Sequence, residues 1–569
     1  MKSKLSDLIR GINRIEVVLL LMLALINIAA PFYTFYGIES RYFIGYLMIH
    51  HTIRRLIGVV ILFVSWKLYK RVSTAWTIAM VALSLGIFQY ILIYHNRITN
   101  PWFALELFSY FILLFSKNYY CRKTSWRSLQ KGLFAYLVYA VFVFFNAMIA
   151  ILKGRGSVPF LTCIRQTVDV MFDTDNLNLM ESSRPLLYHQ FVFWFSWGCI
   201  LIGLLFFLTP YIGAKARTLG EFRRVHELVR KYGENCSTYL ALEKDKRYLF
   251  ARTVEGAIAY GIVQDTMVVL GEPLCDPGDL LPFLTEIKEY CQENAYSLLF
   301  LNVNSTFLEE YRKMGMGTVK CGEEPQFFLP EYSIAGGKGA KIRLNINHAT
   351  NVGLKVLEYR PNERKDPKLE QEIIKISQEW FSMKKCSELV FTMGEIGFEN
   401  PMERRYFYAV NPQGTIEGFI VFLPFKKMDG YVADVTRYRK EAERGIVEKI
   451  FYEAVMTFKA EGIEWASLAL APLARLEEES DAAAKLLNTV YERMNDVYGF
   501  KALYQAKLKY NPTHWEPCYY AYYPPRLTPA VAYSVIRIQN SRGVLDYAKA
   551  LLKNRFRRRT DRKMVQSGI

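Results

Sequence analysis

Four long stretches without a charged residue occupy much of the first 211 positions and restrict what the chain can fold into. A helix that crosses the hydrocarbon core of a bilayer needs about 20 mainly apolar residues. Each of the four stretches supplies that length, so the sequence predicts a membrane domain in this part of the chain. The stretches are Val17–Ile38, Ala75–Tyr94, Gly132–Leu152 and Phe191–Tyr211.

Two weaker segments raise the predicted number of membrane spans to six. Trp102–Ser116 is shorter and contains Glu106, and Ile53–Tyr69 begins with two arginines that would have to reach the membrane interface. The run from Val17 is too long for the apolar region of a cleaved signal peptide, so we interpret it as a true span. We therefore expect an α-helical membrane bundle of about six spans over residues 1–214.

The short loops predict the orientation of this bundle. With six spans, the loops rich in lysine and arginine all fall on one side, whereas the loop 153–190 on the other side is mixed in charge. Basic loops of membrane proteins face the cytoplasm. We therefore expect a multi-pass protein of the cell (plasma) membrane whose N- and C-termini, and everything after residue 214, lie in the cytoplasm.

The overall charge favours anionic partners. The formal net charge is +18 and the pI is near 9.3, which suits phospholipid headgroups or RNA. The positive excess common to membrane proteins explains the charge equally well. The nine cysteines contain no Cys-x-x-Cys pair, and the seven histidines do not cluster with ligand spacing. We therefore expect neither a metal site nor a disulfide framework.

After Leu228 the pattern alternates between strands and helices. Two β-strand groups are each followed by a helix, a buried strand and a helix, which predicts two α/β halves of similar fold rather than one long sheet. The expected parts are 215–335 for the first half, 336–530 for the second half, and 531–569 for a basic C-terminal helix or tail. Within them, "STYLALE" and "YLFAR" are predicted strands, 321–343 a Gly-rich connection, "YVADVTRY" a strand and Arg444–Ala460 a helix.

The unit around "YVADVTRY" has the features of an anion or acyl-donor site. A helix start preceded by basic residues favours anions, and a strand, a basic loop and an amphipathic helix also form the core of the GNAT acetyltransferases. The loop here holds one glycine, Gly445, so a coenzyme A loop is poorly supported. On a straight strand Asp434 and Arg437 would point to opposite faces, so joint action requires the strand to bend or end near Thr436.

A set of short motifs carries a more specific resemblance. They span roughly Ala241–Pro524, and in their order and spacing they resemble the C-terminal synthase domain of the aminoacyl-phosphatidylglycerol synthases, the multiple peptide resistance factor or phosphatidylglycerol lysyltransferase family. The motifs are "LGEP", "CGEEP", "GKGAKIR", "ELVFTMG", "DVTR", "LALAPLA" and "KLKYNPTHWEPCYYAY".

This resemblance implies a cytosolic α/β (α+β) domain of two tandem GNAT-like halves, with the active site in the second. It implies transfer of an amino acid, lysine by analogy, from aminoacyl-tRNA to the hydroxyl of phosphatidylglycerol or a related anionic phospholipid, without metal or another cofactor. The product lipid would lower the negative charge of the membrane surface. A homo-oligomer stays open as a mode of assembly.

The resemblance also implies roles for individual residues. Asp434 matches the acidic residue near the bound amino acid, where it would pair an ammonium group or take a proton. Arg437 matches the neighbouring arginine and would hold a phosphate or a developing oxyanion. The expected substrate-binding residues are Glu323, Glu324, Lys338, Arg343, Glu388, Thr392, Lys507 and Lys509.

Three departures and two alternatives remain. Glu448 and Cys518 stand where the family tends to have aspartate and arginine, and the N-terminal part is too short for a flippase module besides the usual spans. A changed specificity for the amino acid or the lipid fits these departures. The alternatives are a membrane-bound GNAT-type transferase that uses acyl-coenzyme A, and a non-catalytic membrane protein that binds lipid or RNA. An ion pair of Asp434 with Arg437, and plain surface charge at the lysines, are the structural interpretations of the same residues.

Overall fold

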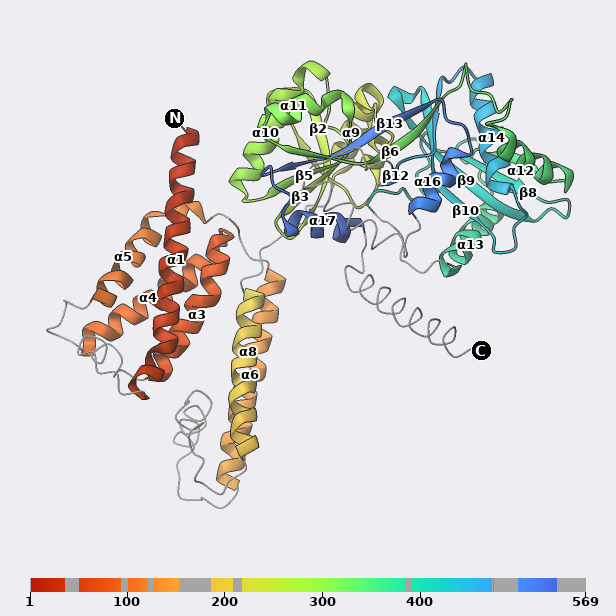
Figure 1. Ribbon diagram of the computed structural model, residues 1–569. Helices are drawn as coiled ribbons and strands as arrows, with labels where there is room; N and C mark the ends of the chain where they lie inside the picture. Colours follow the sequence, from red (N-terminus) through yellow and green to blue (C-terminus); the bar gives the residue numbers. More distant parts are fainter. Residues whose placement is uncertain are drawn as a thin grey trace, which may run out of the picture. The chain divides into compact units, whose positions relative to one another are not determined.

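The computed structural model describes residues 2–35, 51–93, 101–120, 122, 126–152, 186–207, 217–383, 391–472, 474 and 500–539. Its contacts divide the chain into two compact units, Met1–Ala214 and Lys215–Ile569, shown in Figure 1. Glu388 and residues 540–569 of the expected basic C-terminal helix or tail lie outside the described residues.

The described residues of the first unit are mostly helical, and an isolated β-bridge joins Val72 to Arg122. Four of its helices, α1, α3, α4 and α5, share an apolar core that includes Leu20, Ile61 and Leu83, while α6 pairs with α8. Each of these six α-helices overlaps one of the six predicted spans. The bounds are α1 Lys2–Phe35, α3 His51–Tyr69, α4 Ser73–Ile93, α5 Pro101–Phe115, η1 Lys117–Tyr119, α6 Trp126–Leu152 and α8 Leu186–Phe207.

Length and hydropathy single out one of these helices as a candidate membrane span. Among the described residues, the 18-residue window Gly11–Ile28 of α1 is long and apolar enough to cross a bilayer. The other apolar windows in the described residues are shorter: Ile57–Tyr69, Ser73–Phe88, Phe103–Phe115 and Trp197–Phe206. The count of six spans therefore stays a prediction.

The strands of the second unit form one continuous sheet, so the prediction of two halves without a common long sheet was wrong. The 13 described strands run in the order β1-β2-β3-β5-β13-β6-β11-β10-β9-β8-β7, with β4 paired to β2 and β12 to β6. The bounds are β1 Arg247–Phe250, β2 Gly256–Val263, β3 Thr266–Leu270, β4 Leu274–Cys275, β5 Ser297–Asn304, β6 Gly317–Phe328, β7 Lys355–Tyr359, β8 Arg405–Val410, β9 Ile416–Phe425, β10 Gly430–Tyr438, β11 Trp465–Ser467, β12 Ala471–Pro472 and β13 His514–Tyr523.

Strand β13 joins the two halves of this sheet. It comes from the end of the predicted second half, yet it pairs antiparallel with β5 and β6 and so completes the sheet of the first half. Strand β6 is 12 residues long and pairs with β13 on one side and with β11 and β12 on the other. The physical reason for one sheet is therefore a strand long enough to serve both halves.

Helices cover both faces of the sheet (Figure 1). One face, here called the continuous face, carries a single apolar cluster packed by α9, η3, α13 and α17. The other, the divided face, carries one cluster under α10 and α11 and another under α12 and α14. The bounds are α9 Leu219–Tyr232, η3 Thr238–Leu242, η4 Pro277–Asp279, α10 Leu280–Glu293, η5 Ser305–Phe307, α11 Leu308–Lys313, α12 Ala340–Asn351, α13 Pro367–Met383, η6 Lys426–Met428, α14 Ile446–Ala460, α16 Phe500–Leu508 and α17 Pro529–Gln539.

Two local expectations were wrong. "STYLALE" forms the 3₁₀ helix η3 rather than a strand, because its buried side chains, such as Tyr239 and Leu240, all pack into the continuous-face cluster instead of alternating between two faces. Residues 321–328 of the expected Gly-rich connection belong to β6.

Candidate active site

Strand β10 contains an irregularity at Asp434. Its pairing with β9 joins Ala433 to Phe422 and Val435 to Val421, which leaves Asp434 as an extra residue. Such a β-bulge bends a strand and re-aims side chains, often next to active sites. The sequence-based condition for joint action of Asp434 and Arg437, a bend before Thr436, is met by this bulge.

The bulge brings Arg437 to the continuous face. Arg437 lies opposite Phe419 of β9, whose side chain belongs to the continuous-face cluster. The Arg437 guanidinium carbon lies 4.0 Å from the ring centre of Trp380 and 4.8 Å from that of Phe381, both on α13. Arg437 is 2% exposed, so its planar cation is fixed against these rings. Its charge also acts on the Asp434 carboxylate.

The Asp434 carboxylate is held by a backbone N–H. Gly394 N donates to Asp434 Oδ2 at 2.7 Å, and the residue is half-buried. Burial raises the pKa of Asp434 to about 7. The negative charge of Glu243 contributes to this rise, while the Gly394 hydrogen bond and the charges of Arg404 and Arg437 oppose it. Asp434 therefore changes protonation near neutral pH, where a proton acceptor is most effective.

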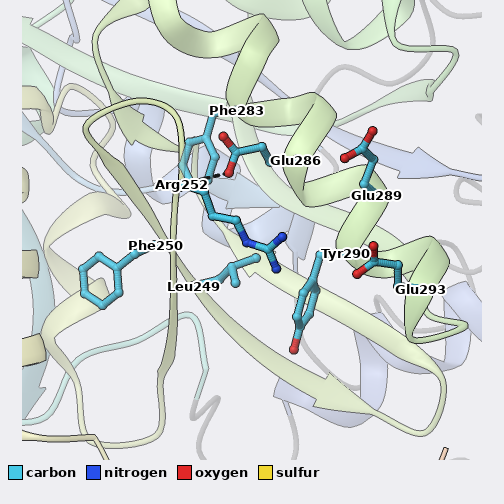
Figure 2. A pocket seen from close by; sticks show the side chains of 8 residues that line it. All are labelled: Leu249, Phe250, Arg252, Phe283, Glu286, Glu289, Tyr290 and Glu293. Atoms are coloured by element: carbon cyan, nitrogen blue, oxygen red, sulfur yellow. Dashed lines mark hydrogen bonds between the residues drawn. The ribbon is translucent and has the colours of Figure 1, made fainter. Parts of the chain in front are cut away.

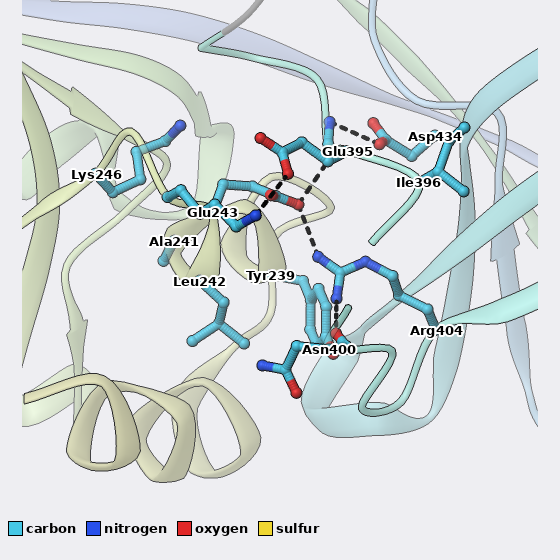
Figure 3. Close-up of polar contacts among 12 residues, drawn as sticks. Tyr239, Ala241, Leu242, Glu243, Lys246, Glu395, Ile396, Asn400, Arg404 and Asp434 are labelled. Carbon is cyan, nitrogen blue, oxygen red and sulfur yellow. Dashed lines mark hydrogen bonds and ion pairs between the residues drawn. The ribbon is translucent and has the colours of Figure 1, made fainter. Parts of the chain in front are cut away.

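Three charged residues that the sequence reasoning missed act on this carboxylate or on its charge: Glu243, Arg404 and Lys246, which Figure 3 labels. Glu243 Oε1 accepts from Arg404 Nη2 at 2.8 Å, and the two side chains are 7% and 4% exposed. Lys246 is buried, with Nζ 4.1 Å from the ring centre of Phe391. Burial lowers the pKa of Lys246, and the paired carboxylate of Asp245 and the nearby charges of Glu243 and Asp434 oppose this effect.

These missed residues come from both halves. Glu243 and Lys246 lie beside η3 and β1, and Arg404 precedes β8, 161 positions after Glu243. The available signal was the charged run "EKDK" directly after the apolar "TYLAL". A sequence alone does not pair that run with an arginine so far away.

The segment before Gly394 contains two predicted site residues. Thr392 is half-buried and lies two positions before Gly394, the glycine that binds Asp434. The structure therefore places Thr392 in the segment that contacts Asp434. Glu388 lies outside the described residues.

Glu324 lies in a separate buried polar cluster. Its Oε1 accepts from Cys236 Sγ at 2.6 Å, from Gln326 Nε2 at 3.0 Å and from Ser467 Oγ at 3.0 Å. Burial raises the pKa of Glu324, and the charge of Lys507 opposes that rise. Glu324 thus binds other side chains of this protein, as expected of a structural group at the junction of the two halves.

Lys507 belongs to the same cluster. Its Nζ donates to Ala469 O at 3.0 Å and to Leu470 O at 2.8 Å. Burial lowers the pKa of Lys507 to about 8, an effect that the charge of Glu324 opposes. Glu323, beside Glu324 on β6, accepts from Lys320 Nζ at 2.8 Å and is also buried.

The remaining predicted residues lie around α12. Arg343 donates to Gly336 O at 2.7 Å and to Ile334 O, so it holds the Gly-rich turn before α12. Lys338 is exposed in that turn. Lys509 forms an ion pair with Glu448 of α14. The contacts of Arg343 and Lys509 are therefore structural, and Lys338 is the exposed cation of the three.

In the connection from β10 to α14, two backbone N–H groups donate to carboxylates of the same protein. Lys440 N donates to Glu379 Oε1 at 2.9 Å, and Glu443 N donates to Glu417 Oε2 at 3.1 Å. Gly445 begins α14 with φ +86°, and a Cβ there would lie 2.2 Å from Asn345 O. The glycine is therefore required by the close approach of α14 to α12.

One pocket lies away from the predicted residues, in the first half between β1 and α10 (Figure 2). It combines an arginine with three glutamates, and Glu286 accepts from the backbone N–H groups of Arg252 and Thr253. Its lining residues are Leu249, Phe250, Arg252, Phe283, Glu286, Glu289, Tyr290 and Glu293. Within the described parts of the chain, no three His, Cys, Asp or Glu side chains gather as metal ligands.

Comparison with known proteins places this chain in a family. Residues 226–522, just over half of the chain, match the family described as phosphatidylglycerol lysyltransferase, C-terminal. The phosphatidylglycerol lysyltransferase of Staphylococcus aureus (strain COL) is 22% identical over 463 residues, covering 80% of this chain and 51% of the relative. That of Staphylococcus haemolyticus (strain JCSC1435) is 22% identical over 361 residues, covering 63% of this chain and 42% of the relative. The chain thus spans about half the length of the curated relatives it matches.

A solved structure shares the α/β fold of the second unit. The structure of L-PGS from Bacillus licheniformis superposes with a TM-score of 0.51 at 22% identity, and covers 58% of this chain and 98% of that chain. The α/β fold predicted for the second unit is confirmed. The family match and this fold confirm the resemblance found in the motifs, and the chain belongs to the phosphatidylglycerol lysyltransferase C-terminal domain family.

Proposed function

We propose that this protein is a membrane aminoacyltransferase that moves an amino acid from aminoacyl-tRNA to the hydroxyl of phosphatidylglycerol or a related lipid. The observation that carries the proposal is the Asp434 carboxylate, held at a bulge between the two halves with a pKa of about 7. The curated relatives named phosphatidylglycerol lysyltransferase support the reaction type.

The chemistry is an ester exchange. The lipid hydroxyl attacks the ester carbonyl of the aminoacyl-tRNA, a new carbon–oxygen bond forms, and the bond to the tRNA ribose breaks. The proton of the lipid hydroxyl passes to the released ribose oxygen. In our proposal Asp434 accepts and returns this proton, and the Arg437 cation stabilises the oxyanion that develops at the carbonyl.

The carboxylates of this site suit an amino acid with ammonium groups. Asp434 and Glu243 place two carboxylates beside one peptide segment, and a buried carboxylate gains most when a cation neutralises it. Lysine is the amino acid we propose, since the matched relatives are lysyltransferases. In this role Asp434 binds the ammonium group rather than the proton, so the two roles predict different pH dependences.

The donor we propose is aminoacyl-tRNA rather than acyl-coenzyme A. A coenzyme A site of the GNAT type would use backbone N–H groups of the loop before α14, where Lys440 N and Glu443 N already donate to carboxylates of the protein. The ester of aminoacyl-tRNA is itself activated, so the reaction calls for neither a metal ion nor a further cofactor. Exposed cations such as Lys338 would contact the tRNA or lipid phosphates, which dominate such affinities.

The experiment is expression of the full chain in a host that lacks aminoacylated lipids, with labelled amino acids and mass spectrometry of the extracted lipids. We expect a new aminoacyl-phosphatidylglycerol that disappears in Asp434→Asn and persists in Asp429→Asn, a control on an exposed aspartate before the same strand. A folded, membrane-inserted protein that yields no aminoacyl-lipid contradicts the proposal. In isolated membranes, we expect RNase to abolish formation of the aminoacyl-lipid if the donor is a tRNA, and to leave its formation unchanged if the donor is acyl-coenzyme A.

A further inference from the structure

We infer that Glu243 and Arg404 are positioning residues for Asp434: this buried pair bridges the two halves, holds the segment 394–400 over the carboxylate, and sets the charge that Asp434 experiences. The inference rests on the proposed function only for what Asp434 does in catalysis.

Two consecutive N–H groups of this segment bind two carboxylates from different halves. Gly394 N donates to Asp434 Oδ2 at 2.7 Å, and Glu395 N donates to Glu243 Oε1 at 3.3 Å. A Cβ on Gly394 would lie 2.6 Å from Asp434 Oδ2 and 3.0 Å from Glu243 Oε1. The backbone at Gly394 is therefore in close contact with both carboxylates. A movement of either carboxylate would shift this backbone and, through it, the other carboxylate.

Arg404 closes this arrangement from the other side. Its Nη2 donates to Glu243 Oε1 at 2.8 Å and its Nη1 donates to Asn400 O at 3.1 Å, as Figure 3 shows. The guanidinium thereby ties the first half, through Glu243, to the end of the segment at Asn400. Tyr406 OH donates to Ile396 O at 2.9 Å between these points. The segment is thus fixed along its length before any substrate binds, as pre-organised catalytic groups require.

The pair also acts on the charge of the site. Four charged groups from four places in the fold face Asp434: Glu243 after η3, Lys246 before β1, Arg404 before β8, and Arg437 on β10. Glu243 disfavours ionisation of Asp434 and Arg404 favours it. Removing Glu243 should therefore lower the pKa of Asp434, and removing Arg404 should raise it.

The test is an infrared titration of the protonated carboxyl band of Asp434 in the purified full chain, identified by its loss in Asp434→Asn. We expect Glu243→Gln, which keeps an acceptor oxygen, to lower the midpoint by about 1 pH unit, and Arg404→Gln to raise it by about as much. The pH profile of aminoacyl-lipid formation should shift in the same directions. Because Arg404→Gln leaves Glu243 buried without its ion pair, Glu243→Gln alone is decisive if the arginine variant does not fold.

A neighbouring ion pair supplies the matched control. Arg405 is the next residue after Arg404, and it binds Glu358 at 2.6 Å with side chains 12% and 14% exposed. Its guanidinium lies over rings of the divided-face cluster, such as Phe407 and Phe458. Glu358→Gln should leave the Asp434 midpoint unchanged. No shift in Glu243→Gln, or the same shift in Glu358→Gln, overturns the inference. A shift without any aminoacyl-lipid in the wild type sustains it and contradicts the proposed function instead.

Discussion

Asp434 and Arg437 lie on the same side of strand β10, although three positions separate them. The extra residue at Asp434 resets the alternation of the strand, so that Arg437 faces α13 from the continuous face. A carboxylate and a guanidinium that a straight strand would keep apart can therefore serve one substrate.

The stacking of Arg437 gives the first prediction. Arg437→Lys keeps the positive charge but loses the planar group that lies 4.0 Å from the Trp380 ring centre. We expect kcat for aminoacyl-lipid formation to fall about a hundredfold, as for other misplaced catalytic groups. Arg439→Lys, at an arginine paired with Glu372 and Glu379, is the control and should retain activity. Equal activity of both variants would remove Arg437 from the site.

The raised pKa of Asp434 predicts how stability depends on pH. In the unfolded chain this aspartate ionises near 3.8, and in the folded protein near 7. Between these values the folded state holds a proton that the unfolded state has lost, so rising pH lowers the free energy of unfolding, by up to roughly 4 kcal/mol in total. Above about pH 7 the loss is complete.

Asp434→Asn removes this dependence. We expect the variant to match the wild type near pH 4 and to unfold at a higher temperature than the wild type at pH 8. Comparison with the variant is needed because burial also raises the pKa of Glu272 to about 7. A variant less stable than the wild type at pH 8 would mean that Asp434 is ionised at no cost in the folded protein.

Gly394 provides a steric prediction. Because a Cβ would lie 2.6 Å from Asp434 Oδ2, Gly394→Ala must displace the carboxylate or the segment, and we expect about a hundredfold loss of kcat. Gly220→Ala in α9 meets no heavy atom within 4 Å and should leave activity intact. Steady-state rates of lipid aminoacylation measure both, and full activity of Gly394→Ala would show that the segment is not rigid.

Glu324 provides a prediction about stability. Glu324→Ala leaves the donors of Cys236, Gln326 and Ser467 without their common acceptor, and we expect a loss of roughly 3 kcal/mol in the free energy of unfolding. Glu331→Ala, at an exposed glutamate after β6, should change it by less than about 0.5 kcal/mol. Denaturant titration followed by tryptophan fluorescence distinguishes the two. An unchanged stability together with lost activity would return Glu324 to the substrate-binding residues.

The elements of the second unit were largely predictable where their signals are local. The apolar stripe of α14 follows directly from the helical spacing of its apolar residues in the sequence. The bulge at Asp434 was not predictable, because it depends on how β10 is paired with β9. Glu243 was missed for a similar reason. Its role depends on contacts with Arg404 and Glu395, and both residues are more than 150 positions away in the sequence.

The place of β13 has a consequence for how the protein is made. A strand that is synthesised after residue 513 lies between β5 and β6, whose own synthesis ends at Phe328. While the ribosome is still translating the intervening part, β5 and β6 lack the neighbour that joins them and expose unpaired strand edges. The first half therefore completes its sheet only after β13 has left the ribosome, and premature termination before His514 would leave both edges open to aggregation.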